Sequence, residues 1–271
     1  MGNPDNIIGI LAAAGDMPVI LTSQLRASGY TPFVIAIDGM ADAVLPMADI
    51  TIRLGAASRI ITAFKDAGCR QIIMTGKFIR PSLMQIKPDL TVAKLAFKAL
   101  STSDNNALQL IADFLAGYDL HMADLHQILP DIFASAGVIA GKAPTKKQQA
   151  SIEKAVAVLD ALGDCDVGQA VIVQQQRVLA IEAAEGTNAM ICRAGDYMSP
   201  DFLPPILVKM SKYGQNKRLD PPVIGTETLT LAAENGVTMV VVEAGGVILA
   251  DRDECLATAR RLKMSLFGLT G

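Results

Sequence analysis

Short β-rich runs alternate with helical patterns through the first half of this 271-residue chain, and this alternation restricts the fold more than any other feature. The runs have the length and aliphatic composition of buried strands and lie at residues 7–12, 33–37, 50–53 and 71–76. Helical patterns at 18–28 and 58–67 lie between them. Because strands that alternate with helices usually pair in parallel, we expect βαβ units and a parallel sheet.

The second half shows a different order of elements. Strand-like runs at 170–174 and 178–182 flank a tight connection, as in a hairpin. The runs at 238–242 and 247–250 suggest another such pair. This half is therefore predicted to be mixed α+β.

The segment between the halves suggests a domain boundary. Helical patterns at 90–100 and 106–115 end the first half, and a polar stretch at 142–149 begins a long amphipathic helix that ends near Gly163. The fold class is therefore predicted to be α/β, with a Rossmann-like parallel-sheet domain first and a mixed α+β domain second. The expected divisions are 1–135 for the first domain, 136–163 for the linker and connecting helix, and 164–271 for the second domain.

Composition and charge exclude several classes of protein. Hydrophobic residues make up 51% and charged residues 19%, which indicates a compact globular chain. A net charge of −3, few aromatic residues and no Trp argue against nucleic acid as a partner. The four cysteines form no CxxC pair, so we expect small buried thiols in a reducing compartment. Neither a signal peptide nor a membrane span is expected.

Small residues link the first predicted strand to the first predicted helix. The segment that contains Ala12, Ala13 and Gly15 leads to Pro18 near the start of the helix. Such a segment brings backbone N–H groups close to a ligand phosphate and could hold a diphosphate or a uridine. It lacks the GxGxxG pattern, and close packing of the strand on the helix explains the same residues. Both interpretations stay open.

A second candidate segment follows the strand predicted at 178–182. It contains Glu185, Gly186, Thr187 and Asn188, and Thr187 suits the N-cap of a helix with free N–H groups. An anion or hydroxyl site and an ordinary capped helix explain this segment equally well.

A third segment gathers cations before a rigid acid. Lys209, Lys212, Lys217 and Arg218 occur within ten residues, and no acid lies between them and Asp220. Four positive charges could neutralise a diphosphate, although a solvated basic loop is the alternative. The two prolines after Asp220 hold that residue extended and stiffen the next part of the chain. Such a carboxylate is a candidate for positioning water or holding Mg²⁺.

The order and spacing of six segments resemble the LpxI family of UDP-2,3-diacylglucosamine pyrophosphatases, which act in lipid A synthesis in Gram-negative bacteria. The resemblance extends over about residues 8–268. The segments are Gly9-Ile-Leu-Ala to Met17-Pro18, Gly76-Lys-Phe-Ile-Arg80-Pro81, Asp166-Val-Gly-Gln169-Ala-Val171, Glu182-Ala-Ala-Glu185-Gly-Thr-Asn-Ala-Met190, Arg218-Leu-Asp220-Pro-Pro-Val-Ile-Gly225 and Glu243-Ala-Gly245.

This resemblance implies a Mg²⁺-dependent hydrolase that cleaves a diphosphate to UMP and 2,3-diacylglucosamine 1-phosphate. The N-terminal domain would bind the UDP-sugar and the C-terminal domain the acylated sugar phosphate. The resemblance also implies a cytoplasmic enzyme associated peripherally with the inner membrane, where its acylated UDP-glucosamine substrate resides. The oligomeric state is left open, and a homodimer is one of the possibilities.

The family's functional positions map onto named residues of this chain. Asp220 matches the acid regarded as catalytic and is also assigned to the metal. The substrate-binding positions are Ala12, Ala13, Gly15, Gly76, Arg80, Glu185, Gly186, Thr187, Asn188, Lys209, Lys212, Gln215 and Arg218.

The chain departs from the family pattern in one direction. Asn105, Asn106, Asn188 and Asn216 stand where the family usually has Asp, and two alanines, at 13 and 14, replace usual glycines. Asparagine keeps an oxygen acceptor but loses the charge. The main alternative is therefore a non-catalytic nucleotide-sugar or lipid-binding homologue. An NAD-dependent oxidoreductase is a weaker alternative that rests on the βαβ start alone.

Overall fold

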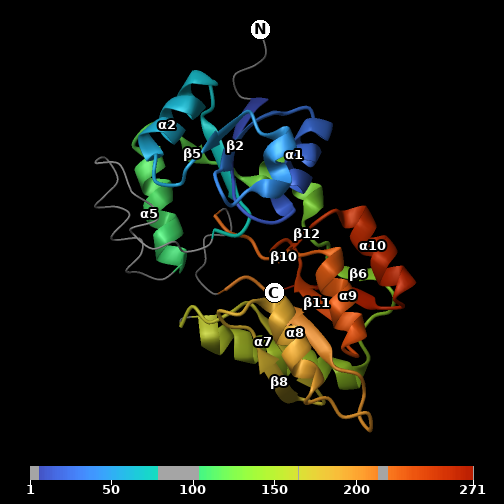
Figure 1. Cartoon of the computed structure of the whole chain (residues 1–271). Helices are drawn as coiled ribbons and strands as arrows, with labels where there is room; N and C mark the ends of the chain where they lie inside the picture. Colours follow the sequence, from blue (N-terminus) through green and yellow to red (C-terminus); the bar gives the residue numbers. More distant parts are fainter. Residues whose placement is uncertain (1–5, 79–103, 164, 213–218, 271) are drawn as a thin grey trace. The chain divides into compact units, whose positions relative to one another are not determined.

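The protein is described by a computed structural model, which covers residues 6–78, 104–163, 165–212 and 219–270. The chain forms two compact units, Met1–Pro130 with Arg218–Asp220 and Asp131–Lys217 with Pro221–Gly271. Each unit has a sheet and helices of its own (Figure 1). In the part of the chain that the structure describes, no helix has both the length and the apolar composition needed to cross a bilayer.

The first unit is built on a parallel sheet. Among the described residues its strands follow the order β3-β2-β1-β4-β5, and each neighbouring pair is parallel. The bounds are β1 Ile7–Ala12, β2 Thr31–Ile37, β3 Ile50–Ile52, β4 Gln71–Thr75 and β5 His121–Met122. This arrangement confirms the predicted Rossmann-like sheet, because the strand order reverses between β1 and β4 as it does in dinucleotide-binding folds.

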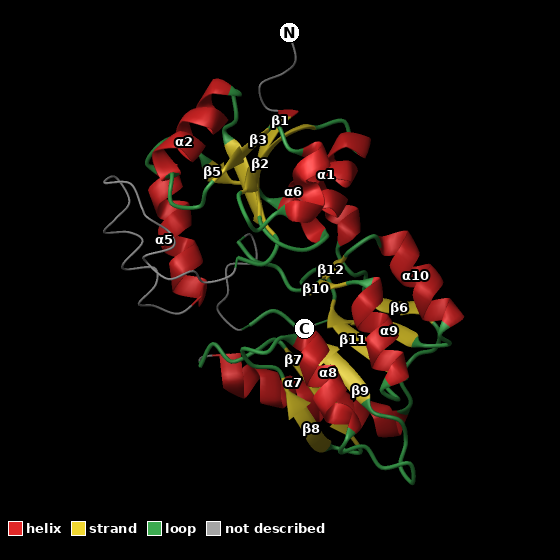
Figure 2. Ribbon diagram, in the orientation of Figure 1, coloured by secondary structure: helices red, strands yellow, loops and turns green. Residues whose placement is uncertain are grey.

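Helices cover both faces of this sheet (Figure 2). On one face, Phe64 of α2 and Leu115 of α5 pack with Leu11, Ile35 and Ile72 of the strands. The alternate strand residues point toward the opposite face, where α1 lies, as the twofold period of a strand requires. The helical elements are α1 Met17–Ala27, η2 Asp42–Met47, α2 Ala57–Asp66, α5 Asp104–Ala116, α6 Leu125–Ile128 and η3 Pro130–Ile132. The helix predicted at 90–100 lies outside the described residues.

The second unit has a mixed sheet in the order β6-β13-β11-β9-β7-β8. The central strands β9, β11 and β13 are parallel, whereas β6, β7 and β8 pair antiparallel to their neighbours. A separate parallel pair joins β10 to β12. The bounds are β6 Gly137–Ala140, β7 Ala170–Gln174, β8 Arg177–Ile181, β9 Ile206–Lys209, β10 Val223–Ile224, β11 Met239–Glu243, β12 Ile248–Leu249 and β13 Ser265–Leu269.

Two separate cores pack on the two faces of this mixed sheet. Along β7, Val171 and Val173 face α7, whereas Ala170 and Ile172 face the opposite side. The helices of that opposite side are α8, α9 and α10, so the unit has three layers (Figure 1). The bounds are α7 Lys146–Gly163, α8 Thr187–Gly195, α9 Thr226–Glu234 and α10 Arg252–Arg261. The segment 136–163, expected to be a linker and connecting helix, thus forms β6 and α7 of this unit.

One predicted strand pairing is wrong. The runs at 238–242 and 247–250 are strands, yet β11 pairs with β9 and β13, while β12 pairs with β10. The cause is a turn at Gly246, where Val247 N donates to Glu243 O (3.1 Å) and the chain leaves the sheet. The hairpin predicted between β7 and β8 is confirmed, with Gln175 and Gln176 both at positive φ in its turn.

The loops after β1 and β4 cross at the end of the first sheet. Ala13 N donates to Thr75 O (2.9 Å) and Lys77 N donates to Ala14 O (2.8 Å). This crossing requires glycine at position 76, because its φ is +94° and a Cβ there would lie 2.7 Å from Ala14 O.

The crossing makes Gly76→Ala strongly destabilising. We expect a loss of about 2–4 kcal/mol, since backbone strain adds to overpacking against the main chain. The matched control is Gly15→Ala, where φ is +93° but no described atom lies within 4 Å of the added Cβ. That variant should lose about 1 kcal/mol. Urea unfolding of the two variants measures the difference, and equal losses would contradict the close approach at Gly76.

The β7–β8 turn gives an opposite prediction. Gln176 has a φ of 65°, a conformation that glycine adopts at lower cost, and its side chain is exposed. Gln176→Gly should raise the free energy of unfolding by up to about 1 kcal/mol. The backbone hydrogen bond from Gln176 N to Ser151 Oγ (3.1 Å) does not depend on the side chain. A lower melting temperature for the variant would refute this interpretation of the turn.

Candidate active site

The first candidate site lies at the carboxyl ends of β1 and β4. Ligands of parallel α/β sheets bind at the point where the strand order reverses, and here that point is between these two strands. Ala12 and Ala13 are buried there, and Gly15 precedes α1. Gly76 belongs to the crossing loop, so the structure brings these four predicted residues together. The fifth, Arg80, lies outside the described residues.

The alanines in this loop adopt an ordinary backbone conformation. Positive φ falls on Gly15 and Gly76, whereas neither Ala13 nor Ala14 is among the residues with positive φ. The replacement of the family's usual glycines therefore introduces no backbone strain. Asp16 is the N-cap of α1 and its side chain makes no capping hydrogen bond, so the first N–H groups of α1 have no cap from that residue.

The second candidate site lies at one edge of the mixed sheet. Because β7 runs antiparallel to β9, with Ala170 opposite Lys209, the start of β7 meets the end of β9. The end of β8 and the end of β11 come to the same edge. The polar residues gathered there are Asp166, Gln169, Glu182, Thr187, Lys209, Lys212 and Glu243.

A buried chain of polar groups occupies the centre of this edge. Lys209 Nζ donates to Thr187 Oγ1 (2.8 Å), and that hydroxyl donates to Glu182 Oε1 (2.6 Å). The three residues are each 8% exposed. A buried ammonium without a nearby opposite charge is costly, and the loss of one partner of a buried pair destabilises a protein by about 3–5 kcal/mol. Glu182 supplies that opposite charge across one hydroxyl.

The second lysine of the edge is held by a carboxylate directly. Lys212 Nζ lies 2.5 Å from Asp166 Oδ1, and the lysine side chain is 12% exposed. Close by, Ser211 N donates to Glu243 Oε2 (2.9 Å). Lys209 and Lys212 are thus fixed in a hydrogen-bonded network, which excludes the solvated basic loop for these two residues. The other cations of the predicted cluster, Lys217 and Arg218, lie outside the described residues, as does Gln215.

The start of α8 differs from the prediction. The N-cap is Gly186, with φ of 82°, and Thr187 is the first helical residue. The Thr187 hydroxyl therefore reaches Glu182 instead of capping the helix, and the N-cap prediction for Thr187 is wrong. Glu185 makes an ion pair with Arg193 of α8, and this hydrogen bond lowers the pKa of the Glu185 carboxyl.

The replacement of Asp by Asn at position 188 has a local explanation. Asn188 Oδ1 accepts a hydrogen bond from Thr228 Oγ1 (3.0 Å), which ties α8 to α9. An amide oxygen serves this contact as well as a carboxylate oxygen does. Among the other replaced positions, Asn106 is exposed on α5. The side chain of Asn105 and all of Asn216 lie outside the described part of the structure.

Asp220 is exposed and precedes a firmly held segment. Pro222 O accepts a hydrogen bond from Ile248 N (2.8 Å), which fixes the chain after Asp220 to β12. Asp220 groups with the first unit, whereas Lys209 and Lys212 belong to the second. The expectation that the Asp220 carboxylate lies beside Lys209 and Lys212 therefore stays a prediction.

Three acids of the second candidate site, Asp166, Glu182 and Glu243, already accept hydrogen bonds from protein groups. Among the described residues, no three His, Cys, Asp or Glu side chains cluster as a metal centre would require. Mg²⁺ is usually held by one or two carboxylates, water and substrate phosphates rather than by a protein cage. Asp220 is an exposed carboxylate of the kind that can serve as the protein ligand of such an ion.

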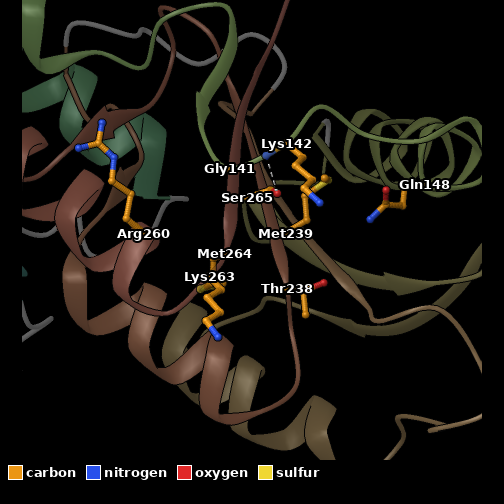
Figure 3. Close-up of a pocket in the computed structure, with 9 residues that line it drawn as sticks. All are labelled: Gly141, Lys142, Gln148, Thr238, Met239, Arg260, Lys263, Met264 and Ser265. Atoms are coloured by element: carbon orange, nitrogen blue, oxygen red, sulfur yellow. Dashed lines mark hydrogen bonds between the residues drawn. The ribbon is translucent and has the colours of Figure 1, made fainter.

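A cavity of about 480 Å³ lies away from these residues. It opens at the amino ends of β11 and β13, the edge of the sheet opposite Lys209 and Glu243. Figure 3 shows Arg260 and Lys263 pointing away from Lys142, so the cations do not converge on a ligand. None of the predicted site residues that the structure describes lines this cavity.

The two buried cysteines, Cys69 and Cys255, are unsuited to act as nucleophiles. Burial raises the pKa of Cys69 to about 11 and that of Cys255 to about 12, so both are thiols at neutral pH. The expectation of buried cysteines holds for these two and is wrong for Cys165 and Cys192, which are exposed.

Sequence reasoning missed four polar residues of the second site. Asp166, Gln169, Glu182 and Glu243 belong to recognisable segments, but residue type alone assigns no role to them. The available signal was position, because Glu182 directly follows the last residue of β8 and Glu243 is the last residue of β11. An acid at the end of a sheet strand, where ligands of α/β proteins often bind, is a candidate for a site.

Comparisons with known proteins identify the family of this chain. The model of the LpxI N-terminal domain matches residues 7–132, and that of the LpxI C-terminal domain matches residues 135–267. A relative from Caulobacter vibrioides, UDP-2,3-diacylglucosamine pyrophosphatase LpxI, is 30% identical over 97% of this chain and 97% of its own length. With both domain models matched in order along nearly its whole length, the chain belongs to the LpxI family.

Proposed function

We propose that this protein hydrolyses the diphosphate of UDP-2,3-diacylglucosamine to UMP and 2,3-diacylglucosamine 1-phosphate, a step of lipid A synthesis. The Caulobacter relative carries the name of this activity and aligns with nearly the whole chain. The structural observation that best supports the proposal is the pair of fixed lysines, Lys209 and Lys212, at one edge of the mixed sheet. Two held ammonium groups suit a phosphate whose negative charge increases in the transition state.

The two units would divide the substrate between them. In the first unit, the small residues Ala12, Ala13 and Gly15 lie at the end of the sheet where the uridine diphosphate would approach the backbone. In the second unit, Lys209, Lys212 and the residues before α8 would bind the phosphate of the acylated sugar. Glu185, just before α8, is paired with Arg193 in the last turn of that helix, and the two would contact polar groups of the acylated sugar.

Asp220 would act on the diphosphate together with Mg²⁺. Its exposed carboxylate would hold the ion and orient the attacking water, while the segment after it is fixed by the Pro222–Ile248 hydrogen bond. When bound, the ion supplies positive charge that offsets the charge of the phosphate oxygens. The lysines of the second unit would do the same from the protein side.

The acyl chains of the substrate determine where in the cell the reaction takes place. A diacylated sugar resides in a lipid bilayer, so we infer that the protein works at the cytoplasmic face of the inner membrane and associates with it peripherally. The inference is supported by the chemistry of the substrate, because two buried acyl chains hold a molecule stably in a bilayer.

Replacement of Asp220 tests the catalytic assignment. Asp220→Asn should lower kcat/KM for UMP release by about a hundredfold or more, because an amide neither holds the metal as well nor accepts a proton. Asp201→Asn, at another exposed acid in a loop, is the matched control and should leave the rate unchanged. The assay follows UMP by chromatography with the acylated substrate in detergent. Equal rates for the two variants would remove Asp220 from the mechanism.

Metal removal tests the cofactor separately. Treatment with EDTA should abolish UMP release, and added Mg²⁺ should restore it. Because we expect the ion to bind with the substrate rather than in a protein cage, the melting temperature without substrate should be the same before and after chelation. Full activity in EDTA would contradict the metal requirement. Tight binding of UDP-2,3-diacylglucosamine by a protein that releases no UMP would instead support the non-catalytic alternative.

A further inference from the structure

The buried chain from Lys209 to Glu182 has a fixed direction. An ammonium group can only donate hydrogen bonds and a carboxylate can only accept them. The Thr187 hydroxyl between them must therefore accept from Lys209 Nζ and donate its proton to Glu182 Oε1. The orientation of the hydroxyl is thus determined by Glu182.

The second oxygen of Glu182 is used as well. Gln169 N donates to Glu182 Oε2 (2.9 Å), and Gln169 O accepts from Met210 N (2.9 Å), the residue that follows Lys209. Glu182 therefore reaches Lys209 by two routes, one through the Thr187 side chain and one through the backbone of Gln169. Both routes lie within the second unit. The first ends at Lys209, the last residue of β9, and the second ends at Met210, the next residue.

We propose that Glu182 is a positioning residue that holds Lys209 in place for the phosphate of the acylated sugar. The proposal rests on the proposed function, because it takes Lys209 as the group that meets the phosphate. Glu182 acts through Thr187 and Gln169 rather than on the substrate. Its carboxylate also compensates the buried ammonium, which keeps the charge of Lys209 at the edge of the sheet.

The conservative variant Glu182→Gln tests this role sharply. Glutamine has nearly the same shape, but only one end of its amide accepts hydrogen bonds. Its NH₂ group must face either the Thr187 hydroxyl or Gln169 N–H, so one donor is left without an acceptor. We expect kcat/KM to fall by about 10- to 100-fold, the range typical for partners that orient a functional group. Glu153→Gln, at an exposed glutamate of α7, is the matched control and should not change the rate.

A double-mutant cycle with Lys209→Met separates positioning from general damage. If Glu182 acts through Lys209, then Glu182→Gln should lower kcat/KM by less than about threefold when Lys209 is already replaced. The same fold-loss in both backgrounds would overturn the proposal. Thr187→Val breaks the chain at its middle and should behave like Glu182→Gln, whereas Thr187→Ser keeps the hydroxyl and should restore most of the rate. If Glu182→Gln does not fold, Thr187→Val takes its place in the cycle.

A second measurement does not depend on activity. In a ¹⁵N-lysine-labelled protein, a buried and hydrogen-bonded ammonium exchanges slowly enough for its protons to be observed by NMR, and Lys209→Arg assigns the signal. We expect this signal to be lost or strongly shifted in Glu182→Gln and unchanged in Glu153→Gln. An unchanged Lys209 signal in Glu182→Gln would refute the positioning role. If the wild-type protein releases no UMP, the proposed function fails, while this spectrum still decides whether Glu182 holds Lys209.

Discussion

The second unit depends on the compensation of one buried positive charge. Lys209 lies at the end of a central strand, where the residue is 8% exposed and its ammonium has lost most of its contact with water. The compensating acid, Glu182, comes from the end of a different strand, and the hydroxyl between them comes from the start of α8. Three elements must therefore be correctly paired before the charge is stable. The same pairing delivers two lysines and three acids to one edge of the sheet.

Local features of the sequence predict much of the fold. The bounds of β1 and β7 agree with the prediction to the residue, because each is a short aliphatic run with clear turn signals beside it. The start of α10 also has a local signal, because Asp251 is followed three residues later by Glu254, as in a capping box. In the structure the Asp251 side chain accepts a hydrogen bond from Glu254 N. The pairing of β11 was not predictable in this way. Its neighbours β9 and β13 are far away in the sequence, and local pattern favoured the nearby run that forms β12.

In the candidate site, too, some residues could be selected from the local sequence, whereas the role of others depends on how distant strands pair. Lys209, Lys212 and Thr187 could be selected from residue type and from the family motif, and the structure brings Lys209 and Thr187 into contact. Glu182 and Asp166 could not be selected, because their importance comes from register. The pairing of Ala170 with Lys209 decides which acid meets which lysine, and no local pattern encodes that pairing. The role of Thr187 was mistaken for the same reason, since its partner lies on the preceding strand end.

The uneven burial of the cysteines has a practical consequence. Cys69 and Cys255 are protected by burial and by raised pKa values, whereas Cys165 and Cys192 are exposed. Cys165 is the chain neighbour of Asp166, which holds Lys212. A maleimide dye would therefore label the native protein at natural thiols, and one of these positions would place a fluorescent reporter beside the lysines without any engineered cysteine.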